Sequence, residues 1–155
     1  MKKYIAYIIC LVMMYGFTGC LSHGLDDIDT YNSADITSIE GVYYRYTTNK
    51  IMNVSGESQV KQIALKMSKP TIDTEAGTVE VTVEPTVNFP AEELQKLSAN
   101  NLVVCLNISV ASVIKPTSGS VRLGVPADWS HPNTYEITAA DKTKKGWTVT
   151  VNLNK

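Results

Sequence analysis

Strict alternation of apolar and polar residues is the feature that most restricts how this chain can fold. In residues 78–83 three valines alternate with threonine and glutamate, and residues 135–140 and 147–153 repeat the pattern. A period of two residues is typical of half-buried β-strands, whereas an amphipathic helix repeats about every 3.6 residues. The chain is therefore predicted to be all-β.

The alternating segments are short and lie between turn-forming residues, which favours a sandwich of short strands. About seven strands are expected, over residues 36–47, 62–68, 78–83, 102–110, 121–125, 135–140 and 147–153, with Val113 and Ile114 extending the fourth. One short crossover helix is expected over residues 90–97, because Pro90 suits a first helical turn and the glutamates that follow suit its positive end. The predicted fold is an immunoglobulin-like antiparallel β-sandwich.

The first expected strand is rich in tyrosine. Alternation places Tyr44 and Tyr46 on one face and Tyr43 and Arg45 on the other, and Gly41 permits a β-bulge. Residues 62–68 and 78–83 are expected to pair with each other.

A short apolar leader precedes the alternating part. Lys2 and Lys3 form a positive start, and the apolar run that follows is too short to span a bilayer. The run closes on small residues and Cys20, the arrangement at which bacterial lipoprotein precursors are cut and acylated. Residues 1–19 are therefore predicted to be a lipoprotein signal peptide, and Cys20 the lipidation site that holds the chain on a membrane.

Residues 20–35 are predicted to be the acylated cysteine and an acidic tether, followed by one domain over residues 36–155. The tether carries four aspartates and no lysine or arginine. Two interpretations of this acidic cluster stay open, a sorting signal for the outer face of the cell and a soluble spacer.

Charge and cysteine content exclude several classes of protein. Without Lys2 and Lys3 the 14 basic residues fall to twelve against 15 acidic residues, a net charge of about −3 with no basic stripe for nucleic acid. Cys105 remains alone once Cys20 is acylated and Cys10 leaves with the leader, so no intrachain disulfide is expected. Cys105 lies in an apolar run and is interpreted as a buried, inert thiol.

No catalytic or metal constellation is found, and no cofactor is expected. Asp128, Ser130 and His131 lie close together in the sequence, but triad members are usually brought together from distant segments. Asp128 and Ser130 are interpreted as shaping a loop through Asx-type hydrogen bonds. With His23 and His131 as the only histidines, no metal-ligand spacing exists.

Aromatic residues are the candidates for ligand contact. Trp129, Tyr135 and Tyr43 are named as candidate contacts for a sugar or a protein partner. For Trp129 two interpretations stay open, a lid over the end of the sandwich and an exposed recognition residue. Trp147 opens an alternating strand and is interpreted as core packing.

Both ends of the predicted mature chain resemble a known group of proteins. The segments LGVPADWS (123–130), YEITAAD (135–141) and KGWTVTV (145–151), together with the tether and first strand, are similar to surface lipoproteins of Bacteroidetes that carry an immunoglobulin-like domain of unknown function. Where such hairpins carry Asp-Gly, this chain has Asp141-Lys142, and a lysine at positive φ costs about 1 kcal/mol or more. A longer turn is therefore expected, with Gly146 in the unusual conformation.

The expected function is that of a lipid-anchored, non-catalytic cell-envelope module that binds a glycan or an outer-membrane partner protein. The resemblance implies an outer-membrane lipoprotein exposed at the cell surface; five residues between Cys20 and Asp26 leave a periplasm-facing location open. A structural alternative is a pilus or fimbria-like subunit, made as a lipoprotein precursor and cut after Arg45.

Overall fold

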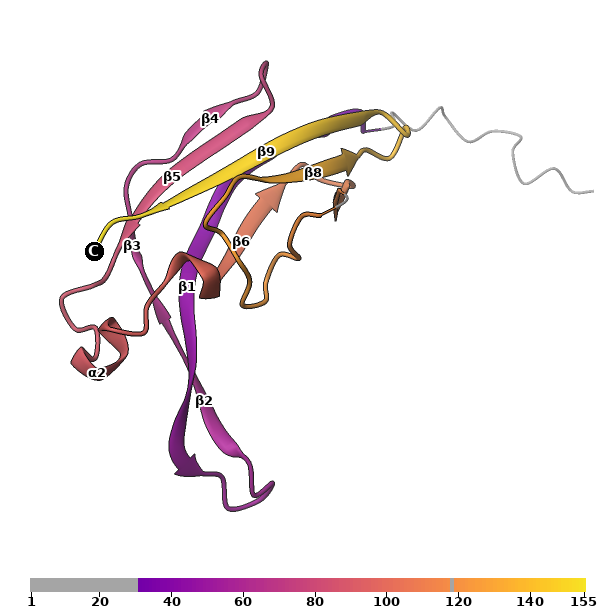
Figure 1. The fold of residues 1–155 in the computed structure, drawn as a ribbon. Coiled ribbons are helices and arrows are strands. Elements are labelled where there is room, and N and C mark those ends of the chain that lie inside the picture. Colours follow the sequence, from indigo (N-terminus) through magenta and orange to yellow (C-terminus); the bar gives the residue numbers. More distant parts are fainter. Residues whose placement is uncertain (1–30, 118) are drawn as a thin grey trace, which may run out of the picture.

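Two β-sheets enclose one core in the computed structural model, which describes residues 31–117 and 119–155 (Figure 1). One sheet has the strand order β2-β1-β6, and the other has the order β3-β5-β9-β8-β7, with β4 also paired to β5. The strands are β1 (Ile36–Ile51), β2 (Ser58–Ala64), β3 (Lys66–Met67), β4 (Thr71–Asp73), β5 (Thr78–Glu84), β6 (Leu102–Ile108), β7 (Val113–Pro116), β8 (Asn133–Thr138) and β9 (Lys144–Leu153). The all-β, sandwich-like prediction is confirmed. The leader, Cys20 and most of the tether lie outside the described residues.

The strand pairs are antiparallel except for one. β5 and β9 run parallel, with Val79 opposite Val149 and Val81 opposite Val151, so the expectation of a purely antiparallel sandwich is wrong for this pair. Parallel strands need a crossover connection. Here the chain leaves β5 through α2 (Ala91–Leu94) and the 3-10 helix η1 (Ala99–Asn101), enters the other sheet at β6 and returns through β7 and β8.

The crossover helix lies where it was expected but is shorter. Pro90 directly precedes the four residues of α2, and Leu97 beyond them is fully buried. Ser98 is extended, and its hydroxyl accepts the Asn100 N–H at 3.3 Å, which starts η1. The extended Ser98 therefore separates the two short helices.

The core is formed by the inward faces of the alternating strands. Val79, Val81 and Val83 are at most 1% exposed, as their alternation predicts, and Trp147 is equally buried. Burying a side chain of this size stabilises the fold by about 1.5–3 kcal/mol. The predicted core role of Trp147 is confirmed.

β1 is 16 residues long, and its two halves pair with different strands. Its first half pairs with β6 up to Tyr44, and its second half pairs with β2 from Tyr43 onward. The register shifts between Ile39 and Gly41, which confirms the predicted bulge. Beyond Tyr44, which pairs with the first residue of β6, the β1–β2 hairpin projects out of the sandwich (Figure 1), and Val54 at its turn is 98% exposed.

Three other expectations about strands are corrected. Residues 62–68 were predicted to pair as a whole with residues 78–83, but they are divided between β2 and β3. β2 pairs with β1, and only β3 pairs with β5. Val113 and Ile114 do not extend β6, because Ala111 adopts φ 57° and turns the chain into the second sheet. Residues 121–125 form no strand, since Gly124 has φ 73°; this loop lies along β6, where Gly124 N–H donates to Val104 O at 3.0 Å.

The turn between β8 and β9 uses a residue that was not expected. Lys142, and not Gly146, has positive φ, at 74°, while Gly146 lies inside β9. The Lys142 N–H donates to Ala139 O at 3.0 Å, and the next N–H, of Thr143, donates to Asp141 Oδ1 at 2.7 Å. These two bonds offset the cost of the left-handed lysine.

The five residues before β1, here called the N-terminal strap (residues 31–35), pack on the domain. Ala34 is 4% exposed and its carbonyl accepts the indole N–H of Trp147 at 2.9 Å. Asp35 forms an ion pair with Lys145 and accepts the Ser109 N–H through its carbonyl at 2.9 Å. The folded part thus includes Ala34 and Asp35, which were assigned to the tether.

Candidate functional site

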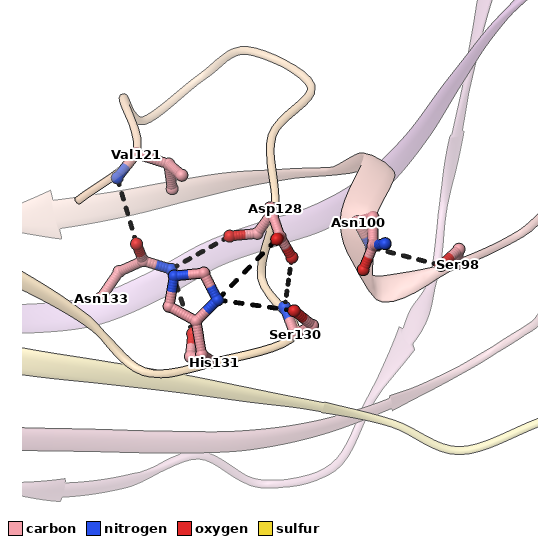
Figure 2. Close-up of polar contacts among 7 residues, drawn as sticks. All are labelled: Ser98, Asn100, Val121, Asp128, Ser130, His131 and Asn133. Carbon is pink, nitrogen blue, oxygen red and sulfur yellow. Dashed lines mark hydrogen bonds and ion pairs between the residues drawn. The ribbon is translucent and has the colours of Figure 1, made fainter. Parts of the chain in front are cut away.

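The loop that contains Asp128, Ser130 and His131 brings these side chains together (Figure 2). His131 Nδ1 lies 3.4 Å from Ser130 Oγ and 3.8 Å from Asp128 Oδ2. A catalytic histidine contacts its serine with one ring nitrogen and its carboxylate with the other, whereas here both neighbours lie at the same nitrogen. This geometry cannot pass a proton from serine through the ring toward the carboxylate.

Local hydrogen bonds explain the cluster. Asp128 Oδ1 accepts the Ser130 N–H at 2.9 Å, the Asx-type bond that was predicted, and hydrogen bonds from Ser130 lower the pKa of Asp128. Beneath them Asn133 is fully buried; its amide donates to Asp128 O and His131 O and accepts from Val121 N–H (Figure 2). Asn133 therefore holds the loop in shape, and the cluster is structural.

Two of the three predicted contact aromatics lie in the core. Trp129 is 1% exposed and Tyr135 0%, and their rings stack with centroids 6.3 Å apart. The Tyr135 hydroxyl donates to Val121 O at 2.9 Å, and burial raises its pKa. Neither ring offers a face to a ligand in this structure, which corrects both assignments and supports the interpretation of Trp129 as a lid.

Tyr43 lies on the opposite face of β1 from the buried Tyr44, as alternation predicts, and is half-buried. Its ring covers Gly41, where a Cβ atom would stand 2.5 Å from the Tyr43 hydroxyl oxygen. Tyr43 thus packs along its own strand and leaves part of its ring in solvent.

A larger aromatic surface forms where the β1–β2 hairpin leaves the sandwich beside α2. A hollow of about 400 Å³ lies there beside a second of about 230 Å³, and the two share the lining residues Tyr46, Thr47, Glu93 and Lys96. We call both together the tyrosine groove. Its lining residues are Tyr44, Arg45, Tyr46, Thr47, Thr48, Asn49, Val60, Pro90, Glu92, Glu93, Lys96, Asn101 and Pro126.

Two tyrosines from β1 form the aromatic part of the groove. The ring centroids of Tyr44 and Tyr46 are 5.8 Å apart, and the two rings are 16° from parallel. The Phe89 ring lies 5.7 Å from the Tyr44 ring and is tilted by 43° against it. Tyr44 is 3% exposed and supports the stack from beneath, while Tyr46 is half-buried. Tyr46 therefore presents the ring that a ligand can reach.

Glu93 is the only buried carboxylate among the described residues, 8% exposed, and both its oxygens have partners. Its Oε2 accepts the Tyr44 hydroxyl at 3.0 Å and its Oε1 accepts Lys96 Nζ at 2.8 Å. The hydrogen bond from Lys96, and to a smaller extent that from Tyr44, lowers the pKa of Glu93. Burial, together with the hydrogen bond to the charged Glu93, raises the pKa of Tyr44 to about 12. Glu93 thus stays charged and Tyr44 stays a neutral donor, and the hydrogen bond between them ties α2 to β1.

Sequence reasoning singled out Tyr43 and missed the groove. Alternation does put Tyr44 and Tyr46 on one face, and this was the available signal. No signal in the sequence pointed to Glu93, the hydrogen-bond partner of Tyr44. Glu93 lies 49 residues from Tyr44, and no local pattern predicts that α2 packs against the hairpin.

Other reactive groups are few in the part of the chain that the structure describes. Cys105 is free and half-buried, and burial raises the pKa of its thiol, which disfavours the thiolate. Within residues 31–117 and 119–155 no three histidine, cysteine, aspartate or glutamate residues are placed to hold a metal ion. No helix in those ranges is long and apolar enough to cross a membrane.

Comparison with known proteins adds a family and a fold relative. A solved structure from Bacteroides fragilis NCTC 9343, described as a "putative secreted protein" (BF4250), is similar with a TM-score of 0.71 and 37% sequence identity, over 81% of this chain and 99% of that chain. The curated proteins include no significant match. The model of the DUF5018-related family matches residues 36–150. This chain therefore belongs to the DUF5018-related family.

Proposed function

We propose that this protein is a non-catalytic, extracytoplasmic binding module and that the tyrosine groove is its contact surface. The observation that carries the proposal is the composition of the groove: a reachable tyrosine ring, amide and hydroxyl groups and two cations around an open hollow. Sites for small ligands have volumes of roughly 300–1,000 Å³ and combine apolar faces with a few polar groups. The groove has this character.

Several observations support the location. The relative from Bacteroides fragilis carries the description of a secreted protein, and the leader ends in a lipoprotein-type cysteine. We propose that Cys20 is acylated and holds the domain on the outer membrane, at the cell surface or else facing the periplasm.

The geometry of β1 suits presentation of a ligand site away from the membrane. The described chain begins beside the β8–β9 turn, where Asp141 N–H donates to Tyr31 O, and β1 then runs to the hairpin at the other end (Figure 1). Sixteen residues at about 3.3 Å each span about 50 Å. The groove and hairpin therefore lie on the side of the domain remote from the N-terminal strap.

The test is binding of a panel of neutral and acidic oligosaccharides, together with recovery of envelope proteins cross-linked to the chain on intact cells. Tyr46→Ala is expected to weaken the interaction at least tenfold by removing the exposed ring. Tyr43→Ala, the neighbouring tyrosine on the opposite face, serves as the matched control and is expected to bind normally. If Tyr43→Ala abolishes binding while Tyr46→Ala does not, the contact surface is the other face of β1.

The pilus alternative gains no support from the position of Arg45. The residue lies inside β1, opposite Gln62, and its guanidinium donates to that amide. A cut after Arg45 would divide β1 between Tyr44 and Tyr46 and with it the tyrosine groove.

A further inference from the structure

The two strands that flank β1 leave it at different places. β2 stays paired with β1 through Thr47, whereas β6 begins at Leu102, opposite Tyr44. Beyond Tyr44, β1 therefore has β2 on one edge and, among the described residues, no strand on the other. We call residues 45–49 along this side the free edge of β1. Such an edge presents unpaired backbone groups that a further strand can join.

The register identifies the backbone groups that point to the free edge. Leu65 N–H donates to Val42 O at 2.9 Å, so the backbone of Val42 faces β2. In an antiparallel ladder every second residue faces the same neighbour, and the register is regular from Tyr43 to Thr47. Arg45 and Thr47 are an odd number of residues from Val42, so their N–H and C=O groups point away from β2.

The chain just before β6 does not close this edge. Asn101 would face Arg45 if β6 began earlier, but its N–H donates to Ser98 O at 3.1 Å within η1. Among the described residues the Arg45 carbonyl and both backbone groups of Thr47 have no backbone partner. An extended polypeptide supplies N–H and C=O groups at the spacing that these groups require.

Both hollows of the tyrosine groove lie along the free edge. The larger is lined by Arg45, Tyr46 and Thr47, and the smaller by Tyr46, Thr47, Thr48 and Asn49, while Glu93 of α2 lines both. Figure 1 shows the hairpin leaving the sandwich beside α2. A strand added to this edge would have its backbone on β1 and every second side chain between Tyr46 and α2.

Tyr46 and Arg45 lie on opposite faces of β1, and successive side chains of one strand reach both faces. The residue opposite Tyr46 would place its side chain beside that ring, where an apolar group packs well. The next residue, opposite Thr47, would lie diagonal to Arg45, whose guanidinium has no carboxylate within ion-pair distance among the described residues. An acidic side chain suits this second position, because arginine donors remain beyond the two that Gln62 accepts.

The charge of the hairpin also favours an acidic partner. Residues 45–62 carry Arg45, Lys50 and Lys61 against Glu57 alone. Two copies of the domain paired through this edge would bring their like charges together, which is destabilising. A segment of opposite charge is therefore a better occupant than a second copy.

We infer that the free edge of β1 binds an extended acidic segment of a partner protein, which adds to the sheet as a strand in line with β6 and antiparallel to β1. The inference rests on the proposed function, since it names the class of partner that the tyrosine groove takes. Thr47 exchanges backbone hydrogen bonds with this segment, and an apolar residue of the segment packs on Tyr46.

The test uses acetylated and amidated eight-residue peptides in which valine alternates with glutamate, titrated into the folded domain by calorimetry. Matched peptides carry lysine in place of each glutamate. The glutamate peptides are expected to bind at least about tenfold more tightly, because lysine would face the cationic hairpin. Equal binding of the two sets overturns the acidic partner.

Backbone methylation of the peptide distinguishes strand addition from contact through side chains. A glutamate opposite Thr47 exchanges N–H and C=O bonds with it, whereas the valine N–H groups point away from β1. Methylation of the glutamate nitrogens is expected to weaken binding at least about tenfold, and methylation of the valine nitrogens to leave it within about threefold. Equal effects, or the reverse order, overturn the antiparallel pairing.

On the protein, Thr47→Pro removes the N–H that faces the added strand without removing a bond to β2. It is expected to weaken peptide binding at least about tenfold, because a peptide carbonyl loses its donor. Thr47→Ala keeps this N–H and is the matched control, with an affinity expected within about twofold of the original. Equal affinities of the two variants overturn strand addition. Thermal unfolding checks that each variant is folded, and the methylated peptides decide the question if Thr47→Pro is not.

The remaining outcomes separate this inference from the proposed function. Absence of peptide binding overturns the inference, whereas Tyr46-dependent binding of a saccharide or cross-linking of an envelope protein keeps the groove as a contact surface. Absence of all three overturns both. If light scattering shows a dimer that Thr47→Pro abolishes, a second copy occupies the edge and the inference is overturned.

Discussion

The two hairpins of this domain, β8–β9 and β1–β2, share the same alternating pattern but serve opposite purposes. In β8–β9 the inward residues Tyr135, Ile137 and Trp147 are at most 1% exposed, because the hairpin lies inside a sheet and faces the other sheet. In β1–β2 the outer half has no sheet across from it, and Ile51 is 61% exposed. Alternation thus predicts a strand, but only packing decides whether its apolar face becomes core or surface.

The largest effect should come from removing a ring in the buried hairpin. Trp147→Ala is expected to lower the free energy of unfolding by about 3–5 kcal/mol, through lost burial and a cavity. Trp147→Phe keeps most of the volume and loses the hydrogen bond to Ala34 O, so it should cost much less. Urea unfolding followed by circular dichroism measures both, and equal losses would show that the hydrogen bond dominates.

A pair of glycines tests the same contrast at the backbone. Gly77 has φ 64° and its added Cβ would stand 2.4 Å from Gly146 O, whereas Gly56 in the β1–β2 turn has φ 70° and open space around it. Gly77→Ala is expected to cost about 2–4 kcal/mol, from positive φ plus a clash with backbone. Gly56→Ala should cost about 1–2 kcal/mol, from positive φ alone. The same unfolding measurement compares them, and similar costs would contradict the role given to the Gly146 contact.

The loss of stability at low pH should depend on the contact between α2 and the β1–β2 hairpin. The pKa of Glu93 is lower in the folded protein than its ordinary value of 4.5, so its contribution is present above that pH and is lost as pH falls through the folded pKa. Glu93→Gln should flatten this loss. Asp128 and Asp141 also have lowered pKa values and will keep part of the slope. Thermal midpoints from pH 2.5 to 6 measure it, and an unchanged slope in Glu93→Gln would mean that this contact is not coupled to folding.

The smallest effect is expected at the hairpin turn. Val54 is 98% exposed, and Val54→Ser should change the free energy of unfolding by no more than about 0.5 kcal/mol. A loss above 1 kcal/mol would show that this turn packs against something other than solvent and would remove the contrast between the two hairpins.

Local patterns predicted the elements whose surroundings are simple. Residues 78–83 and 147–153 were identified correctly, because each places one face on the core along its whole length. The Asx bond at Asp128 was also predicted, since it joins residues two apart. Such features depend on a few neighbouring residues.

The misses share one physical cause, which is competition between local preference and distant contacts. Lys142 takes a conformation that lysine disfavours because Asp141 and Ala139 hold the turn. Residues 121–125 lie along β6 and are not a strand of their own. The tyrosine groove needs Glu93 to meet Tyr44, and only the crossover between sheets brings them together.

The continuity of β1 has a mechanical consequence. If the chain is held at Cys20 and a ligand at Tyr46, tension enters at the N-terminal strap and leaves about ten residues later through the covalent backbone of a single strand. The hydrogen bonds of the sheet that contains β5, β9 and β8 then lie outside the line of force. A pull on the bound ligand therefore does not separate the two sheets. The contact of α2 with this strand is the hydrogen bond from Tyr44 to Glu93, which lies to the side of the line of force. A domain built this way can transmit force between a surface and a bound ligand while its core stays unloaded.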